Sequence, residues 1–177
     1  MPEPPTVVVL RPVAELAALD RVELAAALAP LWEDAAVLAD LLVGRSFSGW
    51  AELVDAAEAE IARADEATRV ALLRAHPRLG ADPVGLRRRS ATSWAEQGGD
   101  RRGEPDLDGM LAELNDRYEE RFGFPFVAWV AGRPLRDMIA VLEERMTHRR
   151  DEELQAGCEA MVAIARDRLG RIEGERA

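Results

Sequence analysis

The chain has 177 residues, and its 33 Asp and Glu residues outnumber its 23 Lys and Arg residues to give a formal net charge of −10 at pH 7. This length is most simply one domain with room for a sizeable core. The acidic balance argues against nucleic acids and anionic membrane surfaces as partners, because both carry dense negative charge. No apolar run approaches the roughly 18 residues that a membrane span needs, so we expect a cytoplasmic protein.

The composition predicts an all-α fold. Hydrophobic residues make up 48% of the chain, but aromatic residues make up only 5%. Alanine, leucine, glutamate and arginine dominate, and this mixture favours helices over strands. Prolines mark residues 1–12 as an irregular leader, and residues 13–177 are predicted to form a single compact domain of about seven or eight helices. The one cysteine, Cys158, cannot form an internal disulfide.

Two helices are expected at the start of the domain. The first is predicted over residues 13–29, where Pro30 stops the helical pattern. The second is predicted over residues 31–43 and is closed by Gly44.

The third and fourth expected helices lead to a histidine. Ser48 is predicted to cap the third helix, and Asp65 is predicted to cap the short fourth one. The fourth helix must end near His76, because a residue that precedes proline is pushed out of the helical region. The sequence therefore places His76 at a helix terminus.

The second half of the chain contains more helix breakers. A Gly/Pro/Arg-rich loop is predicted over 77–92, and a second breaker-rich stretch follows over 98–105. A helix is then predicted over 107–122, capped by Gly123, and an apolar run follows over 126–131. Two more helices are expected, one from Pro134 to about Met146 and a last one over 152–169 ended by Gly170. The length of the first loop suggests function or mobility, and the role of its basic run Arg87 to Arg89 is open. The apolar run is too short to distinguish extended backbone from a buried helical turn.

His76 is the first candidate for chemistry. The chain has two histidines, and a histidine at a helix end more often supports the helix dipole or makes a local hydrogen bond. His148 fits that bland role, because it lies in a polar turn between two predicted helices. His76 differs, because Pro77 fixes the backbone after it and a long loop follows. A group that titrates near neutral pH on such a rigid corner suits a proton donor.

The segment Ser93 to Gln97 allows two interpretations. Ser93-x-x-Glu96 is a capping-box pattern, and a purely structural cap is the more common meaning. Gln97 adds an amide that both donates and accepts hydrogen bonds, so the same segment also suits recognition of a carboxylate. The two roles are compatible, because a capping turn also holds Glu96 in place.

The segment around residues 114–130 mixes core and candidate binding residues. Tyr118 and Phe122 continue an apolar helical stripe, and we expect them in the core. Asn115 lies beside that stripe, where a local hydrogen bond is its expected role. The backbone of Phe126 to Val130 follows Pro125 and is expected to leave polar main-chain groups that need partners.

No metal or cofactor motif is present in the sequence. One usable histidine and no clustered cysteines give too few ligands for zinc. A dinucleotide or phosphate-binding loop, a Gly-x-Ser-x-Gly elbow and a Cys/His pairing at recognisable spacing are likewise missing.

Three motifs in order resemble one enzyme family. They are His76-Pro77, Ser93-x-x-Glu96-Gln97, and Leu114-Asn115-x-x-Tyr118-x-x-Arg121-Phe122-Gly123-Phe124-Pro125-Phe126. Each motif is weak alone, but the ordered set is similar to the 2-oxo-4-hydroxy-4-carboxy-5-ureidoimidazoline (OHCU) decarboxylases. The resemblance covers residues from about Pro30 to Gly170.

The resemblance implies an all-helical homodimer that needs no cofactor and acts on a small molecule, converting OHCU to (S)-allantoin in urate breakdown. It implies that His76 donates the proton and that the carboxyl group of Glu96 assists. The substrate contacts that it implies are Pro77, Ser93, Trp94, Ala95, Gln97, Arg168 and the backbone of Phe126, Val127, Ala128, Trp129 and Val130. Arg168 is implied as a cation that receives the substrate carboxylate.

Two alternatives remain open from the sequence. One is an enzyme on the same scaffold that acts on a different ureido or imidazolone acid. The other is a helical interaction module without catalysis, which would keep His76 and Glu96 apart or buried in unrelated contacts.

Overall fold

The computed structural model describes residues 9–80 and 105–174, and all statements on structure concern these ranges. They contain helices and no strand, which confirms the predicted all-α fold. The helices are α1 (Val13–Leu16), α2 (Arg21–Trp32), α3 (Ala36–Leu42), α4 (Trp50–Arg63), α5 (Glu66–Ala75), α8 (Pro105–Phe122), α9 (Asp137–Arg145) and α10 (Arg150–Gly174).

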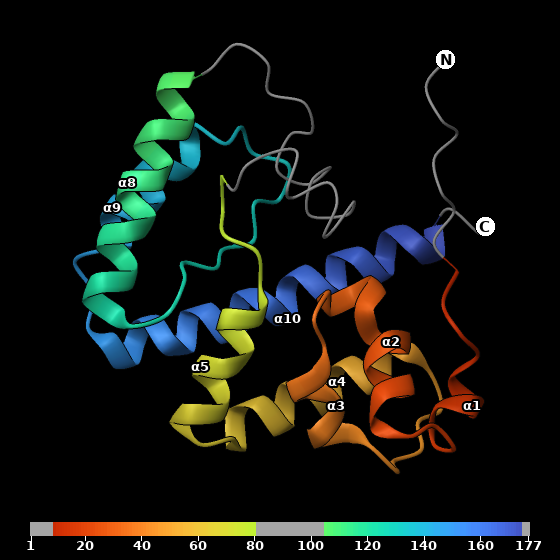
Figure 1. Ribbon diagram of the computed structural model, residues 1–177. Coiled ribbons are helices and arrows are strands. Elements are labelled where there is room, and N and C mark those ends of the chain that lie inside the picture. Colours follow the sequence, from red (N-terminus) through yellow and green to blue (C-terminus); the bar gives the residue numbers. More distant parts are fainter. Residues whose placement is uncertain (1–8, 81–104, 175–177) are drawn as a thin grey trace.

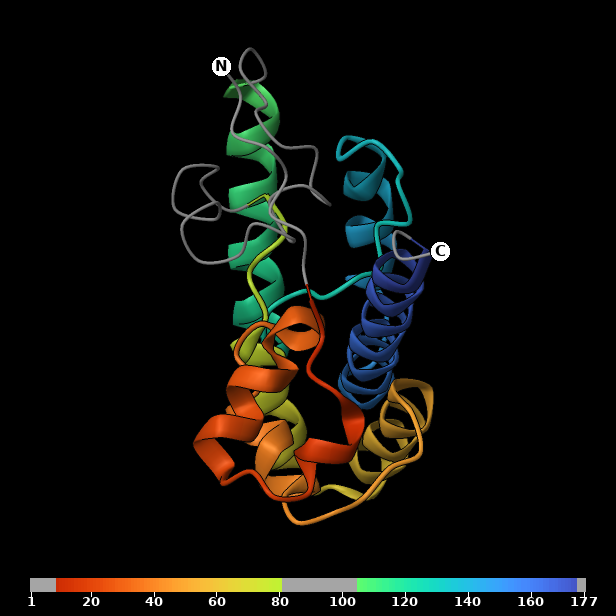
Figure 2. The same cartoon turned by 90° about the vertical axis from the view of Figure 1, so that its right-hand side faces the viewer.

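The long helix α10 is the axis of the fold (Figure 1). It packs against α2, α4 and α5. Helices α8 and α9 pack together near the N-terminal end of α10 (Figures 1 and 2). On α10, the apolar residues Leu154, Cys158, Met161, Val162, Ala165 and Leu169 are all buried. Gly157 allows α5 to approach closely, because a Cβ at this position would lie 2.9 Å from Leu73 Cδ1.

The first predicted helix was wrong in its boundaries. The chain forms the short α1 and then restarts at α2, because Asp20 caps α2 in a reciprocal capping box with Glu23. Pro30 does not stop this helix but lies inside it, and α2 continues to Trp32. A proline removes a hydrogen bond that the helix would otherwise make, yet the buried side chains of Leu31 and Trp32 keep the last turn in the core.

The boundaries of the next two helices also differ from the prediction. The expected helix over 31–43 is shortened to α3, because residues 31 and 32 belong to α2. Gly44 follows it with φ of +77°, as a closing glycine should. The N-cap of α4 is Gly49 rather than Ser48, although the Ser48 backbone N–H and hydroxyl both donate to Glu52, at 2.6 and 2.5 Å.

The helix that leads to the histidine was predicted correctly. Asp65 caps α5 by accepting a hydrogen bond from Thr68 N at 2.8 Å. Helix α5 ends at Ala75, and His76 adopts extended backbone angles of φ −81° and ψ 137°. The steric demand of Pro77 therefore ends the helix at the predicted residue.

The later helices agree in place but not in all their ends. Gly123 terminates α8 with φ of +82°, as predicted. Pro134 starts a turn rather than a helix, and α9 begins three residues later at Asp137. The prediction that Gly170 ends the last helix was wrong, because α10 continues to Gly174 and buries Ile172.

The apolar run over 126–131 has no regular secondary structure. The residues of the expected leader that the structure describes, 9–12, are also irregular, but Leu10 is buried and Arg11 O accepts a hydrogen bond from Trp50 Nε1 at 3.1 Å. Within the described ranges, no helix combines the length and apolarity that crossing a membrane requires.

Candidate active site

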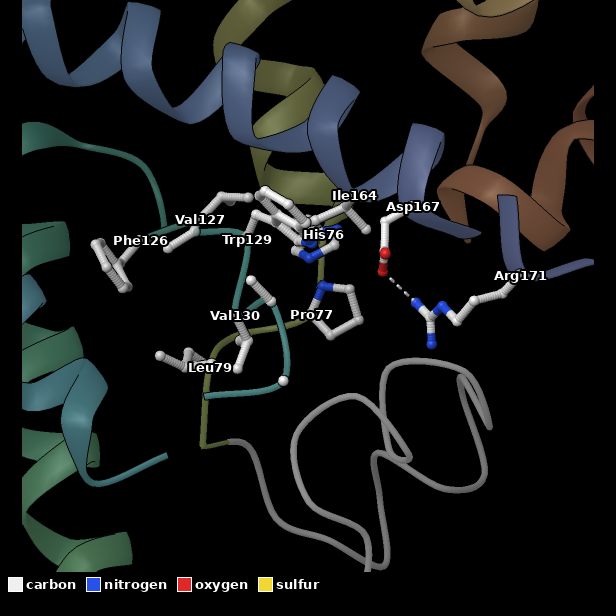
Figure 3. Close-up of a pocket in the computed structure, with 13 residues that line it drawn as sticks. His76, Pro77, Leu79, Phe126, Val127, Trp129, Val130, Ile164, Asp167 and Arg171 are labelled. Atoms are coloured by element: carbon white, nitrogen blue, oxygen red, sulfur yellow. Dashed lines mark hydrogen bonds and ion pairs between the residues drawn. The ribbon is translucent and has the colours of Figure 1, made fainter. Parts of the chain in front are cut away.

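A pocket of about 210 Å³ lies where three parts of the chain meet (Figure 3). The corner after α5 provides one wall, the irregular segment 126–132 provides the second, and α10 provides the third. Its lining residues are His76, Pro77, Leu79, Phe126, Val127, Ala128, Trp129, Val130, Ala131, Gly132, Ile164, Asp167 and Arg171. Such a volume suits a compact metabolite, since pockets for drug-sized ligands are commonly larger.

The His76–Pro77 corner is fastened to α8. Arg78 follows the corner and contacts Glu119 at 2.5 Å and Asp116 at 2.9 Å. These two carboxylates raise the pKa of Arg78 above its ordinary value, although partial burial acts in the opposite direction. The guanidinium therefore stays charged, and it anchors the backbone immediately after the histidine.

Asn115 holds the next part of this wall. Its buried Nδ2 donates to Leu79 O at 2.8 Å and to Leu111 O at 2.7 Å. The bond to Leu111, one turn earlier in α8, is the local bond expected for Asn115. The bond to Leu79 joins α8 to the pocket wall. The structure thus confirms the modest role of Asn115 and gives it a second, long-range partner.

The segment opposite His76 is held by arginines through its carbonyl groups. Arg145 Nη1 donates to Val127 O at 2.9 Å, and its guanidinium lies 4.9 Å from the centre of the Phe126 ring. Arg133 donates to Val130 O at 3.0 Å and to Trp129 O at 2.8 Å. Among the described residues, none accepts a hydrogen bond from the backbone N–H groups of this segment between Phe126 and Val130. Backbone donors in such a wall need a partner.

A buried carboxylate supports this segment from behind. The Glu153 side chain is fully buried and binds Arg145 at 2.8 Å and His148 Nδ1 at 2.7 Å. The hydroxyl of Tyr118 also donates to Glu153. Burial is the main cause that raises the pKa of Tyr118 above its ordinary value, and the neighbouring carboxylate adds to it. Tyr118 and Phe122 lie in the core, as predicted from the apolar stripe.

His76 has a buried ionic partner that no sequence motif indicated. Its Nδ1 lies 3.3 Å from Glu33 Oε2, and Glu33 Oε1 lies 2.6 Å from Arg168 Nη2. Arg168 Nη1 also donates to Leu31 O at 2.9 Å. Burial alone would raise the pKa of Glu33, but the hydrogen bond from His76 and the charge of Arg168 hold it well below its ordinary 4.5. Glu33 is therefore a carboxylate at neutral pH.

The structure brings part of the predicted site together. His76 and Pro77 share the pocket with Phe126, Val127, Ala128, Trp129 and Val130. Arg168 lies behind His76, where its side chain is 1% exposed and faces Glu33. Ser93, Trp94, Ala95, Glu96 and Gln97, together with the basic run Arg87 to Arg89, lie outside the described residues.

Several lining residues were missed from the sequence. Ile164, Asp167 and Arg171 form the α10 wall, and Arg171 Nη2 lies 2.7 Å from Asp167 Oδ2 (Figure 3). The spacing of Asp167 and Arg171 is that of an ordinary surface pair on a helix, so it gave no signal. Glu33 was missed because its partners lie far away in the sequence.

Comparison with known proteins places the chain. A sequence model described as OHCU decarboxylase matches residues 17–170. The uric acid degradation bifunctional protein PucL of Bacillus subtilis (strain 168) is 30% identical over 132 residues, which cover 75% of this chain but only 26% of that protein. A 2-oxo-4-hydroxy-4-carboxy-5-ureidoimidazoline decarboxylase of Haloferax volcanii is 30% identical over 132 residues, which cover 71% of this chain and 73% of that protein.

The fold also matches a solved structure. A crystal structure of OHCU decarboxylase in the presence of (S)-allantoin superposes with a TM-score of 0.61 at 22% identity, covering 76% of this chain and 89% of that chain. At this identity the likeness concerns the fold. The sequence match over most of the chain carries the assignment: the chain belongs to the OHCU decarboxylase family.

Proposed function

We propose that this chain catalyses the cofactor-independent decarboxylation of OHCU to (S)-allantoin in urate degradation. The observation that carries the proposal is that His76 and Pro77 share one pocket with the segment from Phe126 to Val130, in a chain of this family. The name of PucL refers to uric acid degradation, and the solved relative was determined with (S)-allantoin present. Both support the pathway and the product.

His76 is the proposed proton donor. Its side chain is 11% exposed and lines the pocket, so it can reach a ligand while remaining largely shielded from bulk water. Glu96 is proposed to assist it, as the family resemblance implies. Positioned acid and base groups typically contribute a factor of about 10²–10⁴ to a rate.

The remaining proposed contacts orient the substrate. The backbone N–H groups from Phe126 to Val130, which meet no acceptor among the described residues, suit the oxygen atoms of a ureido group or a carboxylate. Pro77 shapes the corner, and the segment from Ser93 to Gln97 is proposed to contact the ligand. Arg168 is the proposed cation for the substrate carboxylate. Its guanidinium binds Glu33, so a direct contact with the substrate requires it to release Glu33. If it keeps Glu33, Arg168 acts on the site through that carboxylate.

The chemistry follows from these roles. The bond between the ring carbon and the carboxylate breaks, carbon dioxide leaves, and the electron pair stays on the heterocycle, where the ring and its carbonyl delocalise it. His76 then transfers a proton, from one side of the pocket, to the neighbouring ring carbon that bears the ureido group, while the hydroxyl proton moves to the ring nitrogen as the decarboxylated carbon becomes the carbonyl of allantoin. Holding the carboxylate out of the ring plane and stabilising the developing charge lower the barrier. Delivery from one face sets the (S) configuration.

Turnover of the labile substrate tests this proposal. Urate oxidase and hydroxyisourate hydrolase generate OHCU from urate in the cuvette, and circular dichroism follows the appearance of chiral allantoin. We expect the purified chain to accelerate formation of the (S) enantiomer well above the uncatalysed reaction. A rate and an enantiomeric ratio equal to those without the protein would refute the proposed function.

A related ureido or imidazolone acid is the second candidate substrate. Trp129 lines the pocket while 43% exposed, so its indole offers an open face to any planar ring. The same cuvette assay with stable imidazolone acids separates the two candidates. Faster turnover of one of them than of OHCU would favour the second.

We also propose, from the family resemblance, a cytoplasmic homodimer with one catalytic domain over residues 13–177. Sedimentation equilibrium tests the oligomeric state. A mass near 39 kDa, about twice the 19.5 kDa of one chain, is expected, and a single species at the chain mass would refute the dimer.

A further inference from the structure

Glu33 occupies a strained backbone position next to the proposed proton donor. It ends α2 with φ of 48° and ψ of −99°. A non-glycine residue in such a sparsely populated backbone conformation costs roughly 1–3 kcal/mol of stability, so the surrounding structure must hold it in place. Among the described residues, the other non-glycine residue with positive φ is Ala131, which lines the same pocket. The strain is therefore concentrated around this site.

The carboxylate of Glu33 restricts the state of the imidazole. An ionised carboxylate only accepts hydrogen bonds, so its oxygen 3.3 Å from His76 Nδ1 favours the arrangement with a proton on Nδ1. In the neutral imidazole this leaves Nε2 without a proton, and in the charged form Nε2 carries the proton that can be transferred.

Arg168 completes the arrangement. Its guanidinium holds the second oxygen of Glu33 at 2.6 Å and is tied to Leu31 O, so the carboxylate cannot rotate freely away from His76. Among the described residues, the charged groups that face His76 from the packed elements are thus Glu33 at the end of α2 and Arg168 on α10. Asp167 and Arg171, also on α10, line the same pocket.

We propose that Glu33 is a positioning residue for His76: with Arg168 as its clamp, it fixes the proton on Nδ1 and orients the ring. The kinetic consequence of this inference rests on the proposed decarboxylase function. The consequence for the imidazole itself does not. Carboxylates that orient a functional histidine in this way commonly change activity by about 10- to 100-fold when they are removed.

Glu33 also has a structural role, which the tests must distinguish from its effect on His76. Glu33 and Arg168 connect the end of α2 to α10, so removing the carboxylate will also weaken their packing. A loss of stability alone would therefore prove nothing about His76. The tests must measure the imidazole and the chemical step directly.

Nitrogen NMR of the histidine side chains provides the direct test. The chain has two histidines, and His148 binds Glu153 rather than Glu33, so it serves as the internal control once a His148→Gln variant has assigned the signals. In the wild-type protein, long-range ¹⁵N spectra at high pH should show neutral His76 with its proton on Nδ1. Finding the proton on Nε2 instead would overturn the proposal without any variant.

The variant Glu33→Gln removes the charge but keeps the size of the side chain. We expect neutral His76 in this variant to lose its preference for a proton on Nδ1, because the glutamine amide can donate as well as accept, while the tautomer of His148 stays the same. Glu33→Asp retains the carboxylate and should restore part of that preference. An unchanged His76 tautomer in a folded Glu33→Gln protein would overturn the proposal.

Kinetics give the second readout. With OHCU as substrate, kcat of Glu33→Gln should fall about 10- to 100-fold with little change in KM. If the wild-type chain has no OHCU activity, the proposed function fails while the NMR result still decides the role of Glu33. A normal kcat in Glu33→Gln would contradict the positioning role alone.

Discussion

Arg145 connects the buried carboxylate of Glu153 to the pocket wall, because one guanidinium binds Glu153 at 2.8 Å and Val127 O at 2.9 Å. The wall opposite His76 has no helix or strand of its own, so its geometry depends on this arginine. A buried charge pair is thus used here to hold an irregular segment in place. This relationship predicts how the pocket responds to a mutation far from the ligand.

Glu153→Gln should destabilise the protein by about 3 kcal/mol, because breaking a buried pair leaves an uncompensated charge on Arg145. Denaturant unfolding measures this value. Asp151→Asn is the matched control, since the Asp151 side chain is 68% exposed, and it should change stability by less than about 0.5 kcal/mol. Equal losses of stability in the two variants would show that the buried pair of Glu153 and Arg145 does not stabilise the fold.

Gly80→Ala should destabilise more than Gly44→Ala. Both glycines have positive φ, +73° and +77°, so both substitutions carry the same backbone strain. A Cβ at Gly80 would lie 2.9 Å from Leu111 Cδ1 and 3.0 Å from Leu111 Cβ, whereas a Cβ at Gly44 meets nothing within 4 Å. We expect roughly 1 kcal/mol for Gly44→Ala and at least about 1 kcal/mol more for Gly80→Ala. Thermal and denaturant unfolding of both variants measures the difference, and equal losses would contradict the close approach at Leu111.

The pH dependence of stability should report on Glu33. Its pKa is lowered in the folded protein from an ordinary 4.5, so the unfolded chain takes up the proton more readily. The stabilisation is therefore complete above pH 4.5 and is lost as the pH falls below it. The difference in unfolding free energy between wild type and Glu33→Gln should shrink between pH 6 and pH 3. A difference that stays constant across this range would contradict the ionised, paired state.

Cys158 should be unreactive in the native protein. Burial raises the pKa of its thiol to about 11, and the thiolate is the reactive form. A disulfide reagent such as DTNB at pH 7.5 should therefore react at least about 100-fold faster in guanidinium chloride than in buffer. Complete reaction of the folded protein within seconds would show that the thiol is accessible and that this part of α10 opens readily.

The fold and part of the site followed from local rules, and the remainder depended on long-range contacts. Asp65 as a cap and Pro77 as a stop act on neighbouring residues, so the place of His76 was predictable. The prediction was wrong at Pro30 and Gly170, because both helices continue far enough to bury Trp32 and Ile172 despite the cost of a proline and a glycine inside them. Glu33 could not have been found from the pattern, since its role arises only where α2, α5 and α10 meet.

His76 is the proposed donor of the proton that makes (S)-allantoin. The rate and enantiomeric ratio of allantoin formation from OHCU by His76→Ala, followed by circular dichroism, test this role, with folding checked by thermal unfolding. We expect a folded protein whose kcat falls about 10²- to 10⁴-fold and whose product loses its excess of the (S) form. Stereoselective turnover within a few-fold of wild type would contradict this role.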